Sequence, residues 1–321
     1  MNLPVEELRK LSEGILARRG LSDPDAAVVT DILLEAELRG RPSHGMIRLP
    51  GIAERSAGRT PMRLAREGPS YALVDGQENL GYLVAHRCAR TIIGKAETTG
   101  LAVVGGFNTG HCGMLGYYAS MVADAGMIGL AACDTSPRIA PWGGTQPVLG
   151  TNPLAAGFPA RKGQVLVDLS SAAITNGQIL MHMKDGTPLP EGVALGTDGK
   201  LTTDPEAALA GAVLPFGGHK GYALAVMIQI LSGALVRAAP VPQPGRNYGI
   251  FLLAISPTIF MDANLFHEGV EDLIRKIKGS EPAAGVGEVL VPGERAFRER
   301  ARRLTDGIEI DLDLMAELRK L

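Results

Sequence analysis

Three polar side chains, Ser43, His44 and Arg48, stand close together in the stretch RGRPSHGMIRLP, residues 39–50. On a helix, the spacing of His44 and Arg48 places both on one face, with Cβ atoms about 6 Å apart. An arginine fork binds a carboxylate through two parallel hydrogen bonds, and an imidazole exchanges a proton with an oxygen near neutral pH. The spacing thus predicts a 2-oxo acid site, in which Arg48 holds the carboxylate and His44 protonates the carbonyl oxygen. A capped surface turn is the alternative interpretation.

Two glycine-rich turns could bind an anion. In VVGGFNTGHCGMLGYYA, residues 103–119, a strand ends and a helix begins near Met114. Backbone N–H groups and the positive helix end then point above the loop, where they could bind an anionic pyrophosphate. In PFGGHKGYALAV, residues 215–226, His219 and Lys220 begin a long apolar helix, and a lysine there is better tolerated beside an anion. An ordinary glycine turn and a solvated lysine are the alternatives, and the GxGxxG dinucleotide fingerprint is absent.

The chain lacks the signatures of several other site types. The histidines are not paired at helical spacing and the three cysteines form no CxxC motif, so no metal site is expected. Neither the serine-hydrolase motif GxSxG nor a P-loop occurs. The net charge of −2, without a basic stripe, argues against nucleic acid as a partner. The odd cysteine count indicates a reducing cytoplasm, and the apolar run at residues 222–236 is too short to span a membrane.

Hydrophobic spacing predicts the elements that position these residues. Helices are expected over residues 4–19 and over a segment capped by Asp23 and ended at Gly40. Together with a short helix at 39–50, they make residues 1–70 all helical. From residue 71 strands and helices alternate, which predicts an α/β layer. Strands are expected at 71–76, 101–106, 127–133, 164–170 and 247–255, with helices at 80–100, 114–126 and 219–238.

Two further segments carry expectations about their placement. His182, in MHMKDG, is expected in a loop. The tail from about Glu294 is expected to form a helix, a short strand and a last helix. This tail could pack beside the N-terminal helices.

Five blocks of the chain, in order, resemble the type-2 malate/L-lactate dehydrogenase family. They are SHGMIRLP, NTGHCGMLGYYA, APWGGTQPVLGTNPLAAGFP, VDLSSAAITNGQI and PFGGHKGYALAVMIQILSGAL. The family includes sulfolactate, ureidoglycolate and 2,3-diketogulonate oxidoreductases and the cyclic-imine-2-carboxylate reductases. The resemblance implies an oxidoreductase that uses NAD or NADP and transfers a hydride between nicotinamide and a small 2-oxo or 2-hydroxy acid of the malate, lactate or sulfolactate kind.

The resemblance also implies a fold class. It is an α/β fold distinct from the Rossmann fold and like that of L-sulfolactate dehydrogenase, with a mixed sheet and a helical part made by both chain ends. The expected division is a helical substrate and dimerisation part, residues 1–70 plus 295–321, and an α/β cofactor-binding domain, residues 71–294. Family members are dimers, so we expect a cytoplasmic homodimer with a small-molecule substrate and neither a nucleic-acid nor a membrane partner.

Residue roles carry over by position. His44 resembles the family's proton donor, polarised by Ser43, and Arg48 resembles the arginine that binds the substrate carboxylate. Thr151, in GTNP, matches a substrate or nicotinamide contact, and Gly285–Glu294 resembles a late cofactor loop. The other matched positions line the cofactor: His111, Cys112, Gly113, Met114, Leu115, Asp168, Leu169, Ser170, His219 and Lys220.

Two departures from the family pattern bear on the substrate. Imine reductases carry an acidic relay residue where this chain has Gln178, which weakens the alternative function, reduction of a cyclic imine 2-carboxylate such as Δ1-pyrroline-2-carboxylate. The segment 239–246 is short relative to the family, so substrate contacts near Asn247 could differ. A third hypothesis, a non-catalytic dinucleotide-binding protein, is disfavoured by the intact Ser43, His44 and Arg48. Trp142, the only tryptophan, could wall the pocket or pack in the core.

Overall fold

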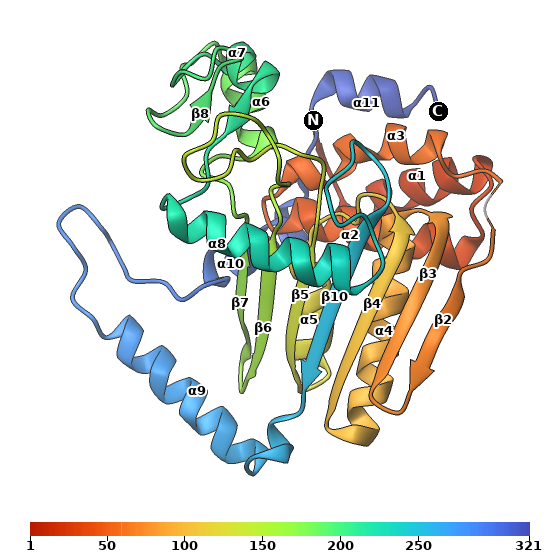
Figure 1. Ribbon diagram of the computed structural model, residues 1–321. Helices are drawn as coiled ribbons and strands as arrows, with labels where there is room; N and C mark the ends of the chain where they lie inside the picture. The colour runs from red at the N-terminus through yellow and green to blue at the C-terminus, as the bar shows by residue number, and fades with distance from the viewer. Residues whose placement is uncertain (59) are drawn as a thin grey trace.

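A seven-stranded mixed sheet forms the centre of the computed structural model, which describes residues 1–58 and 60–321 (Figure 1). The strand order is β2-β3-β4-β10-β5-β6-β7. Within the described residues β3 and β4 run parallel, and the other neighbouring pairs are antiparallel. The expected α/β fold with a mixed sheet is confirmed, and the sheet is not the parallel sheet of a Rossmann domain. The strands are β2 Arg63–Gly68, β3 Tyr71–Asn79, β4 Leu101–Thr109, β5 Ile128–Cys133, β6 Leu154–Ala160, β7 Gly163–Leu169 and β10 Tyr248–Ile255.

Helices cover both faces of this sheet. Helices α4 (Gly81–Thr99) and α5 (Gly116–Asp124) pack on one face, where they contact the strands on both sides of the centre. Helix α8 (His219–Gln229) crosses the other face and continues as a π-helical turn, Ile230–Leu235, against β10 (Figure 1). The helix expected over 219–238 is therefore shorter and changes its winding at Ile230.

Glycines in β4 let both layers approach closely. A Cβ atom on Gly105 would lie 2.7 Å from Val236, and one on Gly106 would lie 3.1 Å from the Cys88 sulfur. Successive residues of a strand face opposite sides of the sheet, so the two glycines serve different layers. Val236 follows the π-helical turn and Cys88 belongs to α4.

The two ends of the chain meet, as the sequence predicted for the tail. Strands β1 (Asn2–Leu3) and β11 (Ile308–Glu309) pair, and helix α10 (Glu294–Asp306) packs against α2 (Asp23–Leu38). The other helices here are α1 Val5–Arg18, α3 Leu49–Glu54 and α11 Leu312–Leu318.

Two local predictions in the N-terminal part are wrong. Strand β2 pairs with β3, so residues 1–70 are not all helical. Its side chains are mostly exposed, as befits an edge strand, and no buried alternation marks it in the sequence. Helix α2 takes its cap from Ser22, whose hydroxyl accepts from the Asp25 amide at 3.4 Å, and Asp23 is its first helical residue.

A small lobe with its own apolar core stands above the sheet on the side of β6 and β7 (Figure 1). It comprises α6 Asn176–Asp185, α7 Pro205–Ala210, β8 Ala194–Leu195 and β9 Ala212–Val213. The expectation of a loop at His182 is wrong, because this residue lies in α6. Thr175 and Gln178 form a capping box at the start of that helix, which is a recognised helix-start pattern.

Helix α9 (Ala263–Lys278) extends away from the body and carries no buried residue (Figure 1). Large apolar side chains are exposed on this helix and the turn before it. They are Ile259, Phe260, Met261, Leu265 and Leu273.

Candidate active site

Ser43, His44 and Arg48 lie on two short turns and not on one helix. Pro42–His44 and Met46–Arg48 are separate 3₁₀ turns, and the backbone breaks between them at Gly45, with φ −93° and ψ −142°. The predicted single helical face is therefore wrong. The two turns are tied together differently, because Arg48 Nε donates to the Ser43 carbonyl at 2.7 Å. This bond uses one donor of the guanidinium and leaves its two terminal NH₂ groups for a ligand.

The His44 imidazole lies between a hydroxyl and a second imidazole. Its Nδ1 is 3.0 Å from Ser43 Oγ, and its ring stacks on His111 with centroids 5.6 Å apart. His111 Nδ1 accepts from the Gly113 amide at 3.1 Å and lies 3.3 Å from the Tyr82 hydroxyl. Two histidines from segments far apart in the sequence thus share one site with Arg48.

Both imidazoles are neutral at pH 7. Burial, together with the charges of Arg48 and Arg41, lowers the pKa of His44 to about 4. Burial and the neighbouring His44 and Arg48 lower the pKa of His111 to about 3. A neutral His44 is prepared to accept a proton, as the oxidation of a hydroxyl group requires.

The loop before α5 is already satisfied within the chain. The Gly113 amide donates to His111, and the Gly116 amide donates to the carboxylate of Asp168, with Oδ2 at 3.3 Å. These two N–H groups are therefore not available to a pyrophosphate, which the sequence placed above this turn. The Cys112, Met114 and Leu115 side chains are buried, and the His111 side chain is only partly buried. A bound ligand would therefore contact the side chains of this segment mainly at His111.

Thr151 and Ser170, two further residues expected at the site, are joined by a hydrogen bond. The Ser170 hydroxyl donates to the Thr151 carbonyl at 3.0 Å, and the Thr151 amide donates to Thr135 Oγ1 at 2.8 Å. The next residue, Asn152, has φ +30°, and its buried side chain donates to the Ala225 carbonyl of α8 at 2.9 Å. The loop that carries Thr151 is thus tied to α8.

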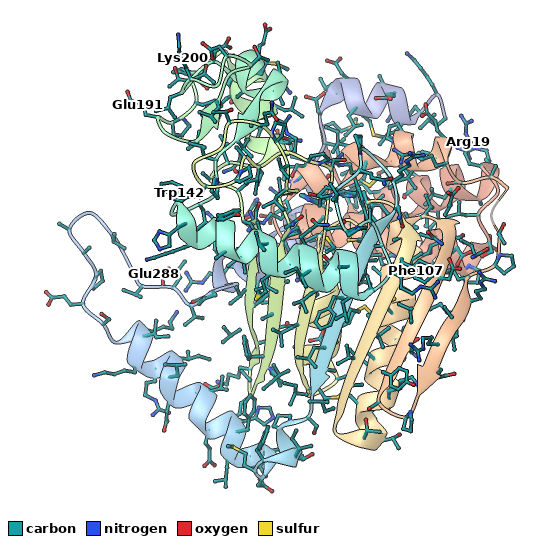
Figure 2. The ribbon with its side chains drawn as sticks, viewed as in Figure 1. Arg19, Phe107, Trp142, Glu191, Lys200 and Glu288 are labelled. Carbon is teal, nitrogen blue, oxygen red and sulfur yellow. The ribbon has the colours of Figure 1, made fainter. Side chains whose placement is uncertain are left out.

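The start of α8 has the features of an anion cradle. Gly217 and Gly218 adopt left-handed backbone conformations, with φ of 55° and 62°, and His219 and Lys220 are exposed. A Cβ atom on Gly218 would lie 2.8 Å from the Trp142 ring. Trp142 is 61% exposed and lies beside this first turn, which excludes simple core packing (Figure 2). Two basic side chains and an open aromatic ring meet here, and the amides of Gly218 and Lys220 already donate to the Pro215 and Gly217 carbonyls, each at 3.3 Å. The charges of His219 and Lys220 are therefore the main attraction for an anion.

The small lobe touches the site at Ser43. A Cβ atom on Gly177 would lie 2.7 Å from Ser43 Cβ, so α6 begins against the turn that carries Ser43 and His44. Gln178 does not point there, because its Oε1 accepts from the amide and the hydroxyl of Thr175 at 3.0 and 2.9 Å. Gln178, at the position where an acidic residue was expected for an imine reductase, therefore caps helix α6.

Two other expected regions are placed as follows. In the short segment 239–246, the Gly245 amide donates to Ser136 Oγ at 3.0 Å, and the same hydroxyl meets Tyr248 at 2.5 Å. The segment Gly285–Glu294 runs through an exposed loop between α9 and α10 and meets β7 where the Leu166 amide donates to the Pro292 carbonyl at 3.1 Å. The cofactor role expected for this segment stays a prediction.

Sequence reasoning missed three residues around the His44 turn, namely Glu37, Arg41 and Tyr82. Glu37 is a charged residue on the buried face of α2, and that mismatch in the helical pattern could have identified it. Tyr82 sits in a strongly apolar helix start, which gave no signal for it. Among the residues that the structure describes, no group of three or more His, Cys, Asp or Glu side chains is placed to hold a metal ion. No helix in that part of the chain is long and apolar enough to cross a membrane.

Comparisons with known proteins identify relatives along the whole chain. A family model described as malate/L-lactate dehydrogenase matches residues 3–319. The L-sulfolactate dehydrogenase of Methanothermobacter thermautotrophicus is 38% identical over 99% of this chain and 95% of its own. A Delta(1)-pyrroline-2-carboxylate reductase of Pseudomonas fluorescens is 34% identical over 100% of this chain and 98% of its own. The solved sulfolactate dehydrogenase of Methanocaldococcus jannaschii superposes with a TM-score of 0.93 at 36% identity, over 100% of this chain and 96% of that one. The expected sulfolactate dehydrogenase-like fold is confirmed.

Proposed function

The chain belongs to the malate/L-lactate dehydrogenase family, and on this premise we propose that it interconverts a small 2-hydroxy acid and its 2-oxo acid with a nicotinamide dinucleotide. One observation carries the proposal, namely the cluster in which Ser43, His44 and Arg48 meet His111. A carboxylate-binding fork beside a neutral imidazole suits the chemistry of such acids. The bound dinucleotide supplies the hydride transfer.

Arg48 orients the substrate and His44 moves its proton. The two terminal NH₂ groups of Arg48 bind the carboxylate, since Nε is held by the Ser43 carbonyl. In the oxidation direction His44 Nδ1 donates to Ser43 Oγ, which leaves the Nε2 lone pair for the substrate hydroxyl. A carboxylate bound at Arg48 offsets part of the positive charge that lowers the pKa of His44, so substrate binding raises the proton affinity of the imidazole.

The residues at the start of α8 fit a dinucleotide. His219 and Lys220 would hold phosphate beside the two left-handed glycines. The residues matched by position would line the rest of the cofactor, with Thr151 at the substrate or nicotinamide ring. They are His111, Cys112, Gly113, Met114, Leu115, Asp168, Leu169 and Ser170. NAD and NADP both fit this arrangement, because none of these residues is assigned to the ribose 2′ position.

The proposal extends to assembly and location. A homodimer is supported by the apolar side chains exposed on and before α9, which a second subunit would cover. The helical part, residues 1–70 plus 295–321, would serve substrate binding and dimerisation, and residues 71–294 would bind the cofactor. A cytoplasmic location is supported by three free cysteines. Two of them, Cys112 and Cys133, are joined by a hydrogen bond of 3.8 Å between their sulfurs and not by a disulfide.

A substrate screen tests the proposed function. Oxidation of NADH and NADPH, side by side, is followed with pyruvate, oxaloacetate, sulfopyruvate and Δ1-pyrroline-2-carboxylate. We expect turnover with at least one 2-oxo acid. Preferred turnover of the cyclic imine would favour the alternative function, imine reduction. The similarity to a pyrroline-2-carboxylate reductase supports this alternative. Dinucleotide binding without turnover of any compound in a broad acid panel would contradict both.

A further inference from the structure

Glu37 is a buried carboxylate next to the catalytic turn. It lies near the end of α2, on the helix face that also buries Val29 and Leu33, and only 3% of its surface is exposed. Burial raises its pKa to about 7, against the opposing effects of the Met46 amide and the Arg303 charge. A buried carboxylate destabilises a fold unless its partners compensate, so its contacts indicate what it does.

The partner of this carboxylate is the junction between the two 3₁₀ turns. Glu37 Oε1 accepts from the Met46 amide at 2.8 Å. The same carboxylate packs against Gly45 so closely that a Cβ atom at that position would overlap it. The Met46 side chain is fully buried in the core, which anchors the junction. His44 directly precedes this junction and Arg48 closes the second turn.

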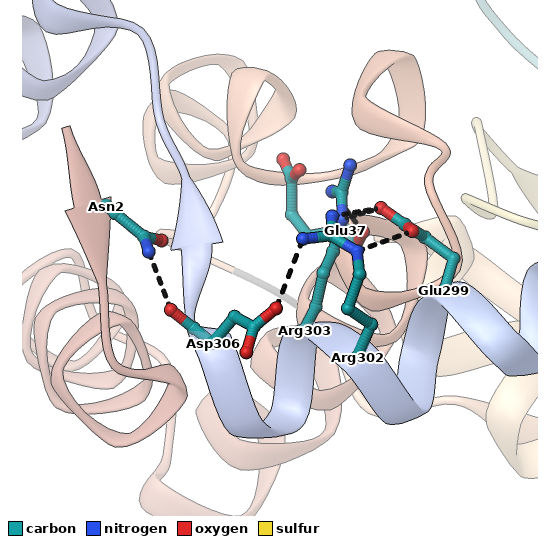
Figure 3. A network of polar contacts seen from close by, with 6 residues as sticks. All are labelled: Asn2, Glu37, Glu299, Arg302, Arg303 and Asp306. Atoms are coloured by element: carbon teal, nitrogen blue, oxygen red, sulfur yellow. Dashed lines mark hydrogen bonds and ion pairs between the residues drawn. The ribbon is translucent and has the colours of Figure 1, made fainter.

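Helix α10 holds the backbone of Glu37. Arg303 of α10 donates through Nη1 to the Glu37 carbonyl at 2.7 Å. Arg303 is paired with Glu299, which also pairs with Arg302, and Arg302 reaches Asp306 at 3.3 Å (Figure 3). The end of α2 is therefore clamped between the tail of the chain and the catalytic turn.

We propose that Glu37 is a positioning residue, which sets the relative placement of His44 and Arg48 through its hydrogen bond to the Met46 amide and its contact with Gly45. The inference rests on the proposed function of those two side chains. Glu37 touches neither of them, so it acts on catalysis only through the backbone between them. A displacement of about 1 Å of such groups can lower a rate about 100-fold.

Two substitutions at Glu37 separate the acceptor from the charge and the volume. Glu37→Met keeps a similar length without an acceptor, and Glu37→Gln keeps the oxygen that faces Met46. Glu35→Gln is the matched control, because Glu35 lies on the same helix and pairs with Arg39 and Arg300. With the best acid of the substrate screen, we expect Glu37→Met to lower kcat and raise the KM of the acid, with kcat/KM about 10- to 100-fold lower. The Kd of NADH should stay within about twofold, and Glu37→Gln should recover most of the lost activity.

A second series tests the contact with Gly45. Gly45 has a φ of −93°, outside the left-handed region, and the Glu37 carboxylate fills the space that a Cβ atom would need, so Gly45→Ala should reproduce the loss. In a Glu37→Ala background these overlaps with the carboxylate are gone, and Gly45→Ala should cause a much smaller loss than it does in the wild type. This non-additivity does not depend on Glu37→Met folding.

Three outcomes would overturn the inference: a folded Glu37→Met variant with wild-type kcat and KM, a Glu37→Gln variant as impaired as Glu37→Met, or additive effects of the Gly45 and Glu37 substitutions. Unchanged kinetics in His44→Ala and Arg48→Lys would instead refute the proposed function. Losses in those two variants with none at Glu37 or Gly45 would refute only the positioning role.

Discussion

Replacing Arg48 with Lys keeps the positive charge and removes the fork. In the structure, Arg48 uses Nε to hold the Ser43 carbonyl at 2.7 Å and has two NH₂ groups left for a carboxylate. A lysine ammonium is a single point donor and cannot make this set of bonds in one geometry. The loss of one hydrogen bond to a charged group costs about 1.5–3 kcal/mol, which corresponds to a decrease of about 10- to 150-fold in kcat/KM.

Steady-state kinetics with the best acid of the substrate screen measure this decrease. We expect the KM of the acid to rise and kcat to fall together, because the fork also orients the reacting carbon. The Kd of NADH, from fluorescence titration, should not change. Arg66→Lys is the control, since Arg66 is exposed on the edge strand β2. Wild-type kcat/KM in Arg48→Lys would refute the assignment, and a change in KM alone would limit Arg48 to binding substrate and transition state equally.

Three further predictions concern the histidines and the start of α8. His44→Ala should lower kcat about 10²- to 10⁴-fold with an unchanged NADH Kd, and a retained rate would remove His44 from proton transfer. Lys220→Met should raise the Kd of NADH about fivefold, a loss of about 1 kcal/mol in binding free energy, and the control Lys200→Met should leave it unchanged. Fluorescence titration measures both values, and a wild-type Kd in Lys220→Met would place the phosphates elsewhere. His111→Gln should gain stability relative to wild type as the pH falls from 6.5 to 5, because unfolding lets His111 take up a proton that its folded pKa of about 3 excludes. The relative gain is at most about 2 kcal/mol, from urea denaturation at both pH values, and a pH-independent difference would contradict the lowered pKa.

The comparison with wild type is needed because other buried groups act in the opposite direction. Burial raises the pKa of Glu37 and of Asp134 to about 7. Each of these carboxyls binds a proton in the folded state between its unfolded pKa and pH 7, so each favours folding as the pH falls through that range. The lowered pKa values of His44 and His111 disfavour folding over much the same range, from 6.5 downward. Acidification of the wild-type protein therefore mixes both signs.

The sequence predicted the fold class better than the local backbone of the candidate site. Ordered family blocks identified the fold class, and the roles of His44 and Arg48 stay predictions. The helical face expected for His44 and Arg48 was wrong, because Gly45 breaks the helix and a buried carboxylate from α2 holds the break. That contact joins residues nine positions apart on different elements, and local propensity does not contain it.

Elements with weak or conflicting local patterns were also missed. Strand β6 reads LAAGFPA, with glycine and proline in a segment that pairs with β5 and β7, so tertiary pairing overrides a poor strand pattern. Helix α9 was not predicted as a separate element, although its apolar residues repeat at helical spacing. By contrast, α4 was predicted closely, since a glycine in the left-handed conformation at Gly100 ends it.

The two glycine-rich turns looked equivalent in the sequence, and the structure distinguishes them by charge. At α5 the first turn already holds Asp168, whose carboxylate accepts from the Gly116 amide, so a pyrophosphate there would meet a like charge. At α8 the first turn contains no acidic residue and presents His219 and Lys220 to solvent. This contrast favours α8 for the phosphates and leaves His111 of the α5 loop to face His44. Asn152 connects the Thr151 loop with α8, because it follows Thr151 in the chain and its side chain donates to the Ala225 carbonyl. Ser171 makes a second link, because its carbonyl accepts from the Phe216 amide at 3.0 Å and its hydroxyl donates to the Asn152 carbonyl at 2.6 Å. A shift of α8 on dinucleotide binding would therefore reach the Thr151 loop through Asn152 and Ser171.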